Sequence, residues 1–354
     1  MIQLQMKPDL EQSLNRIDAW YQGEVLDRAP VDFGPQYRRN EALDHMQFSS
    51  LRERWMSVDY HMECIRAMVP EQPVLGDGIP NVILDLGPVF FSALYGGELV
   101  FGEDTSWMDP FVTSYDQPLH MHMAGNVYFD KMEELIKSAL EQFAGQVNIG
   151  YPDLHPGLDC LACFRGSETL CFDLYEYPDE LKRLAGQVID DFEKLFRHYH
   201  RLVAEHGQLS ISWMGVPSRE SMHIPSCDFS YMISPAQFEE FVLPVIQREA
   251  KMARHNVFHM DGPGVARHVD MICSIPEIQA VQWVPGAGEP DPVTKWVPLL
   301  QTIRSHGKSV YVYVSPQELD AFLAAMPPKG VFIHCDTTDR EVQKQVLKKV
   351  EKWT

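Results

Sequence analysis

Residues 256–284 read NVFHMDGPGVARHVDMICSIPEIQAVQWV. The apolar runs at 256–260 and 279–284 have the length of buried strands, and residues 265–275 between them have the spacing of an amphipathic helix. A helix that joins two buried strands predicts a βαβ unit with parallel strands. This stretch therefore indicates an α/β protein.

The same alternation continues along the chain on both sides of this stretch. Further strands are expected at 30–34, 146–150, 208–214, 309–314 and 330–334. Helices are expected at 129–143, 178–205, 234–255, 293–306, 316–325 and 338–351. Such a series of about seven or eight β/α units is typical of a (β/α)8 TIM barrel. An open doubly wound sheet is the alternative, although its glycine signature is incomplete because Gly262 and Gly264 are followed by Arg267.

The part of the chain before the regular pattern is expected to hold N-terminal helices and an irregular insertion. Helices are predicted at 10–21 and 41–68, the first within an N-terminal extension of residues 1–28. Residues 72–129 are rich in Gly, Pro and aromatic residues without a sustained period, and long segments of this kind are usually functional. We expect one domain over residues 1–354.

The composition excludes several classes of partner. The 354 residues include 50 carboxylates against 30 Lys and Arg, a net charge of −20, which argues against a nucleic-acid or anionic-membrane partner. No stretch approaches the roughly 18 apolar residues of a membrane span, and the start has no signal-peptide pattern. Seven cysteines, an odd number, indicate reduced thiols. We therefore expect a cytoplasmic enzyme that acts on a small molecule and that can form a homodimer.

The predicted strand ends carry the chemistry, since the active site of a TIM barrel lies at the carboxyl ends of its strands. His259 and Asp261 are two residues apart and share one side of an extended strand, and Cys335 follows the last strand. A histidine, a carboxylate and a thiolate would give Zn²⁺ three ligands and leave a fourth position open. Alternatively, Cys335 is a buried small residue and His259 a hydrogen-bonded polar residue.

Other residues near the strand ends complete the candidate site. Asp228 and Asp336 are candidate catalytic carboxylates. Arginines pair with carboxylates in a bidentate manner, and aromatic residues line pockets. The candidate substrate-binding residues are Arg38, Arg39, Arg219, Trp213 and Trp283.

Five segments carry a resemblance to a known family. They are FRGSE at 164–168, DLYEYP at 173–178, ISPAQFEEF at 233–241, HMDG at 259–262 and FIHCD at 332–336. The chain resembles the uroporphyrinogen decarboxylase superfamily, which includes the decarboxylase and the zinc-dependent corrinoid-linked methyltransferases. The resemblance implies a TIM barrel and is closest in character to the methyltransferases.

The resemblance also implies a ligand set and a reaction. The methyltransferases bind zinc through a His-x-Cys-Gly strand end and a later Cys, which correspond here to His259, Asp261 in place of the first Cys, and Cys335. The zinc lowers the pKa of a thiol acceptor, which takes a methyl group from a corrinoid, either free or on a corrinoid protein. Asp228 or Asp336 would orient the acceptor. A carboxylate oxygen is a harder ligand than the thiolate of the family's Cys. The identity of the metal therefore stays open.

Two other functions remain open from the sequence. The first is a metal-free decarboxylase or other lyase, in which Arg38, Arg39 and Arg219 hold a small carboxylated substrate. The second is a non-catalytic protein that binds a corrinoid or another small molecule. The metal content distinguishes the methyltransferase from the lyase. Binding of a corrinoid without turnover would identify the non-catalytic binding protein.

Overall fold

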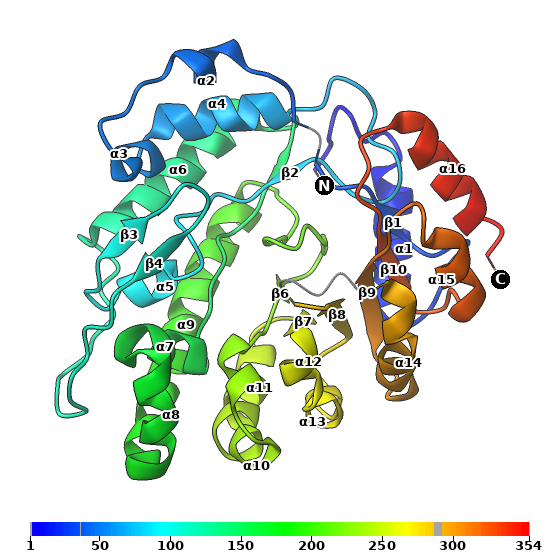
Figure 1. Cartoon of the computed structure of the whole chain (residues 1–354). Helices are drawn as coiled ribbons and strands as arrows, with labels where there is room; N and C mark the ends of the chain where they lie inside the picture. Colours follow the sequence, from blue (N-terminus) through cyan, green and yellow to red (C-terminus); the bar gives the residue numbers. More distant parts are fainter. Residues whose placement is uncertain (1, 36, 287–291, 354) are drawn as a thin grey trace.

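A curled parallel sheet forms the centre of the structure, a computed structural model that describes residues 2–35, 37–286 and 292–353 (Figure 1). Its six strands lie in the order β1-β10-β9-β8-β7-β6. Their bounds are β1 Val31–Asp32, β6 Met222–His223, β7 His255–Asp261, β8 Ala280–Val284, β9 Ser309–Tyr313 and β10 Val331–His334. The α/β class is confirmed, and the sheet is a half-barrel, consistent with an incomplete TIM-like barrel.

Two short sheets accompany the central one. β2 (Asn81–Val82) pairs in parallel with β5 (Asn148–Ile149), and β3 (Leu99–Phe101) forms an antiparallel pair with β4 (Ser106–Met108). Gly150 N–H donates to the Val82 carbonyl, and Tyr151 N–H donates to the Ile211 carbonyl, so residues near 211 lie beside β5. Six of the seven expected strands form, as β1, β5, β7, β8, β9 and β10, whereas β2, β3, β4 and β6 were not predicted.

The strand predicted at 208–214 is wrong. Ser210 forms only an isolated antiparallel bridge with Ser218, because the chain turns back on itself at Gly215, which has φ of +77°. The Ser210 hydroxyl also accepts from the N–H of Met222 at 3.0 Å, at the start of β6. The N–H and the carbonyl of Ser210 are therefore used within this turn.

The long amphipathic helices form as predicted. They are α1 (Leu10–Tyr21), α6 (Val127–Phe143) and α9 (Pro178–Glu205). Asn126 caps α6 by accepting from the N–H groups of Tyr128 and Phe129. Shorter helices follow the later strands, with the bounds η3 Val293–Trp296, α14 Val297–Ser305, α15 Leu319–Ala325 and α16 Arg340–Val350.

Three predicted helices are interrupted. The segment 41–68 forms α2 (Glu41–His45), α3 (Leu51–Trp55) and α4 (Val58–Met68), because the hydroxyls of Ser50 and Ser57 each cap a new helix. The segment after Ser234 forms α10 (Pro235–Gln237), a π-helical turn (Phe238–Val242) and α11 (Leu243–Ala250), whose first turn contains a proline. The segment after β7 forms α12 (Gly262–Ala266) and α13 (Val269–Cys273).

Several short helices have no counterpart in the prediction. They are α5 (Phe90–Ala93), α7 (Gly157–Arg165), α8 (Ser167–Glu176) and the 3₁₀ helix η1 (Asp228–Met232). All seven cysteines are free. Within the part of the chain that the structure describes, none of the helices combines the length and the hydropathy that crossing a bilayer needs.

Candidate metal centre

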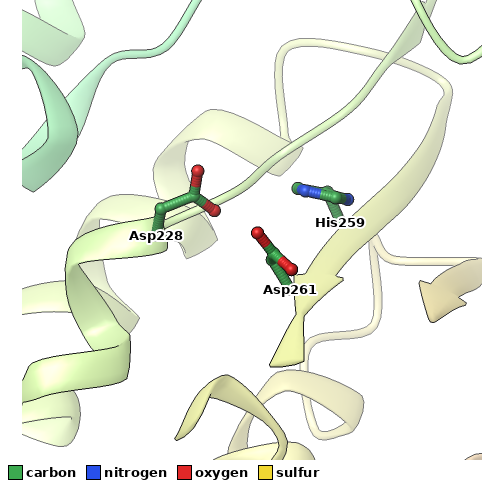
Figure 2. Close-up of side chains that lie close together, drawn as sticks. All are labelled: Asp228, His259 and Asp261. Atoms are coloured by element: carbon green, nitrogen blue, oxygen red, sulfur yellow. The ribbon is translucent and has the colours of Figure 1, made fainter. Parts of the chain in front are cut away.

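Three side chains converge beyond the carboxyl end of β7. His259 and Asp261 lie on one face of that strand, and Asp228 is the first residue of η1. Each offers one ligand atom, and these atoms all lie within 4.8 Å of one another. Figure 2 shows the two carboxylates and the imidazole gathered around a common space. That spacing allows a single cation to contact all three.

A buried glutamine fixes the orientation of His259. Gln282, on the neighbouring strand β8, donates through Nε2 to the Tyr313 hydroxyl at 2.9 Å, and its Oε1 lies 2.5 Å from His259 Nδ1. An amide oxygen can only accept, so His259 Nδ1 carries the proton and donates to it. His259 Nε2 then keeps its lone pair, as a metal ligand requires.

The backbone and an indole ring hold His259 from other sides. His259 N–H donates to the Pro225 carbonyl at 2.9 Å, which ties β7 to the chain just before η1. Trp213 meets the imidazole edge-to-face, with ring centroids 5.0 Å apart. Trp213 therefore restricts the rotation of the imidazole.

Asp159, on α7, positions the third member of the group. Its two carboxylate oxygens accept from the N–H groups of Asp228 and Phe229, at 3.0 Å and 2.9 Å. Burial, together with the charge of Asp228, raises the pKa of Asp159 to about 6. Burial also raises the pKa of Asp261; the charge of His259 opposes this shift and that of Asp228 adds to it. A bound cation would relieve both the burial cost and the repulsion.

No protein-family model matches this sequence, and no curated protein matches it. The fold is similar to that of a methyltransferase. A solved structure described as a methyltransferase from Methanosarcina mazei covers 96% of this chain and 98% of its own length, with a TM-score of 0.58 and 13% identity. At that identity the similarity shows a shared fold. It agrees, at the level of the fold, with the resemblance in the sequence.

Cys335, predicted as the third ligand, does not belong to this group. Side chains alternate along β10, and since His334 lines the cavities at this end of the sheet, Cys335 faces the opposite side. The thiol is fully buried in the hydrophobic core. Burial and the nearby charges of Asp32 and Asp336 raise its pKa to about 11, so the thiol stays protonated. The ligand group that the structure brings together replaces Cys335 with Asp228.

The three candidate arginines are engaged elsewhere. Arg38 pairs with Glu71, Arg39 pairs with Asp44, and Arg219 pairs with Glu11 and Asp18. None of them joins the metal group. The structure therefore gives no shared carboxylate clamp formed by Arg38, Arg39 and Arg219.

Two other predicted residues line a neighbouring cavity. Trp283 and Asp336, together with His334, contribute to a cavity of about 420 Å³. Trp283 is buried and packs against Trp296, with ring centroids 4.7 Å apart. Asp336 is exposed and lies outside the metal group.

An ion pair lies beside the metal group, where His155 lines the same cavity as Asp159 and Asp228. His155 Nε2 lies 2.7 Å from Asp153 Oδ2, and its Nδ1 lies 2.9 Å from the Ser226 hydroxyl. Burial lowers the pKa of His155, but the charges of Asp153, Asp159 and Asp228 outweigh burial and raise it to about 10. The imidazolium thus offsets part of the negative charge around Asp159 and Asp228.

The sequence analysis missed two of the supporting residues. Gln282 has a readable signal, because it is the one polar residue in the apolar strand 280–284. Asp159 has none, because its role depends on α7 and η1 meeting in space. Residues that act through other residues are therefore the harder ones to find.

Proposed function

We propose that this chain is a metal-dependent methyltransferase whose ion is held by Asp228, His259 and Asp261. The observation that carries the proposal is the three ligand atoms within 4.8 Å, with His259 Nε2 left free by the bond to Gln282. The fold shared with a methyltransferase supports the reaction class. The negative charge of the two carboxylates favours a divalent cation.

Zinc is the ion that we propose first. One imidazole and two carboxylates are acceptable ligands for Zn²⁺, and the same set also suits the harder ions Mn²⁺, Fe²⁺ and Co²⁺. Three protein ligands leave a position for the acceptor. When bound, the ion would lower the pKa of a thiol or hydroxyl acceptor, so that an anionic nucleophile exists at neutral pH.

The chain's own residues have distinct parts in this proposal. Gln282 keeps the proton on His259 Nδ1, and Asp159 holds Asp228 in place. Trp213 shields the imidazole from one side. Together they preorganise the ligands, so that binding an ion requires little rearrangement.

The methyl donor that we propose is a corrinoid, and the acceptor is a thiol or another small molecule. Both proposals rest on the resemblance in the sequence, as does a corrinoid protein as partner in the cytoplasm. The metal-free lyase loses support, since its three candidate arginines each pair with carboxylates elsewhere.

Elemental analysis of the purified protein tests the proposal. We expect about one equivalent of a divalent metal per chain, lost in Asp261→Asn and His259→Gln and retained in Cys335→Ala. Circular dichroism checks that each variant folds. If Asp261→Asn keeps the metal, or if Cys335→Ala loses it, the ligand group is wrong.

Turnover tests the reaction class separately. Metal-loaded protein should transfer the methyl group of methylcobalamin to a small thiol, and the metal-free protein should not. Full turnover after removal of the metal by a chelator would contradict the metal-dependent mechanism, and binding of cobalamin without turnover would favour the non-catalytic alternative.

A further inference from the structure

A second cavity lies at the carboxyl ends of β1, β9 and β10. Its volume is about 380 Å³, within the range of small-molecule sites. Its wall combines apolar and aromatic side chains, including Phe33, Ile79 and Ile83, with polar ones. No member of the metal group lines it, although Trp213 and Tyr313 form part of its wall.

A connected trio of side chains provides part of the polar wall of this cavity. His334 Nδ1 pairs with Asp32 Oδ1, and the hydroxyl of Tyr311 donates to Asp32 Oδ2 at 3.3 Å. Asp32 and Tyr311 are buried. An ionised carboxylate oxygen can only accept, so the pairing with Asp32 Oδ1 favours the tautomer in which His334 Nδ1 carries the proton. The Tyr311 hydroxyl also lies 3.1 Å from His334 Nδ1.

The other nitrogen of His334 is free to meet a ligand. Across residues 2–35, 37–286 and 292–353, no hydrogen bond to His334 Nε2 is found. Gly34 leaves this edge of the ring open: a Cβ at that position would lie 3.3 Å from Cε1 and 3.6 Å from Nε2. A carboxylate-bound imidazole whose Nε2 faces a cavity is the arrangement of a proton acceptor.

We propose that this cavity binds a small aromatic or apolar molecule with one hydroxyl group, which donates a hydrogen bond to His334 Nε2. The apolar part of the wall fits the body of such a molecule, and the nearby carboxylates of Asp32 and Asp336 disfavour an anion. Arg340 also lines the cavity, and its guanidinium donates to the Pro73 carbonyl at 3.1 Å. The inference does not depend on the metal centre.

Burial and two carboxylates act on the pKa of His334. Burial lowers the pKa of His334, but the hydrogen bond and charge of Asp32 and the charge of Asp336 outweigh burial, so the pKa lies above its ordinary value. In the neutral imidazole, a higher pKa makes Nε2 a stronger proton acceptor for a hydroxyl.

Titration with phenol, toluene and benzoate at pH 8 tests the proposal. Phenol should bind saturably and about tenfold more tightly than toluene, which matches its shape but has no hydroxyl. His334→Gln should weaken phenol binding about tenfold and leave toluene binding unchanged. His306→Gln is the matched control, because His306 is a histidine paired with a carboxylate, Asp270, outside this cavity. It should change neither.

A measurement on the unaltered protein makes the test independent of how the variants fold. In ¹⁵N NMR spectra, phenol should shift the Nε2 resonance of His334 and leave Nδ1 protonated. The absence of saturable phenol binding, equal binding of phenol and toluene, or tighter binding of benzoate would overturn the proposal. The metal content of His334→Gln should equal that of the unaltered protein, which separates a failure here from a failure of the metal centre.

Discussion

His259 is the residue on which the metal proposal depends most, and its role is set by a neighbour. Gln282 donates a hydrogen bond through its amide nitrogen to the Tyr313 hydroxyl, and its amide oxygen accepts one from His259 Nδ1. A hydrogen-bond partner on the ring nitrogen that does not bind the metal fixes the tautomer and the orientation of a ligating histidine. The metal site therefore extends to a residue that touches no ion.

Replacing Gln282 should weaken metal binding without removing a ligand. Gln282→Leu leaves His259 without its fixed tautomer, and we expect the metal dissociation constant to rise by about 10–100-fold. Competition with a fluorescent chelator measures it. Gln343→Leu is the matched control, because Gln343 is a buried glutamine on α16 that donates to the Thr337 carbonyl. Unchanged affinity in Gln282→Leu would contradict the role of the amide.

His155 makes stability depend on pH. Its pKa is about 10 in the folded chain against about 6.5 when unfolded, so the folded state binds the proton more tightly. The stabilisation is complete below about pH 6.5 and is lost as the pH rises toward 10. Urea unfolding should show the free energy falling by up to about 1.4 kcal/mol per pH unit in that window.

The control for this pH dependence is His155→Gln, which cannot take up the proton. The free energy of unfolding of this variant should vary less between pH 6.5 and 10. A variant that keeps the full slope would show that another group titrates in this range.

The residue scale also shows what the sequence could predict. His259 and Asp261 were paired correctly because strand alternation is a local rule, which needs no knowledge of the rest of the fold. By the same rule His334 and Cys335 face opposite sides, and Cys335 lies outside the group that the structure brings together. The local sequence pattern held no signal for Asp228 as a ligand, because η1 meets the end of β7 only in the folded structure.

At the scale of elements, the start of η1 decides where the third ligand lies. Asp159 reaches from α7 and accepts from the first two N–H groups of this turn. A five-residue 3₁₀ helix has few hydrogen bonds of its own, so the contact from α7 sets its position. The metal group therefore depends on the packing of α7 against η1.

Asp159→Ala should weaken metal binding by releasing Asp228. We expect a loss of affinity together with a loss of stability of about 1 kcal/mol, typical of a lost cap. Asp339→Ala removes a similar cap from α16, where Asp339 accepts from Glu341 and Val342. It should lose similar stability in urea and keep the metal affinity. If the two variants bind metal equally, η1 is positioned by other contacts.

Elements with a strong local pattern were predictable, and those set by turns were not. The period of α9 extends over its whole length, and the structure confirms it. The segment 41–68 has a helical pattern as well, but Ser50 and Ser57 divide it through their capping hydroxyls. The strand expected at 208–214 failed at Gly215, where a positive φ returns the chain on itself.

At the scale of the whole molecule, one buried carboxylate joins three distant parts of the chain. Asp77, which is fully buried, accepts from Arg16 of α1 at 3.0 Å, from Arg28, and from the N–H of Val31 at 2.9 Å. It thus ties the N-terminal helix and the irregular segment to the first strand. The sequence predicted each segment but not this connection between them.

Asp77→Ala should destabilise the chain strongly. Removing one partner leaves two buried guanidinium groups without their shared carboxylate, which costs about 3–5 kcal/mol. Asp190→Ala removes a carboxylate from an exposed pair with Arg248 and should cost less than about 1 kcal/mol. The free energy of unfolding in urea measures both. Similar losses in the two variants would show that the buried cluster contributes little.

Anomalous diffraction from crystals of the metal-loaded protein, recorded at the absorption edge of its metal, tests the central claim most directly. The account predicts one peak, bonded to His259 Nε2 and to carboxylate oxygens of Asp228 and Asp261. A peak on the sulfur of Cys335, or a peak elsewhere with those three side chains unligated, would contradict it.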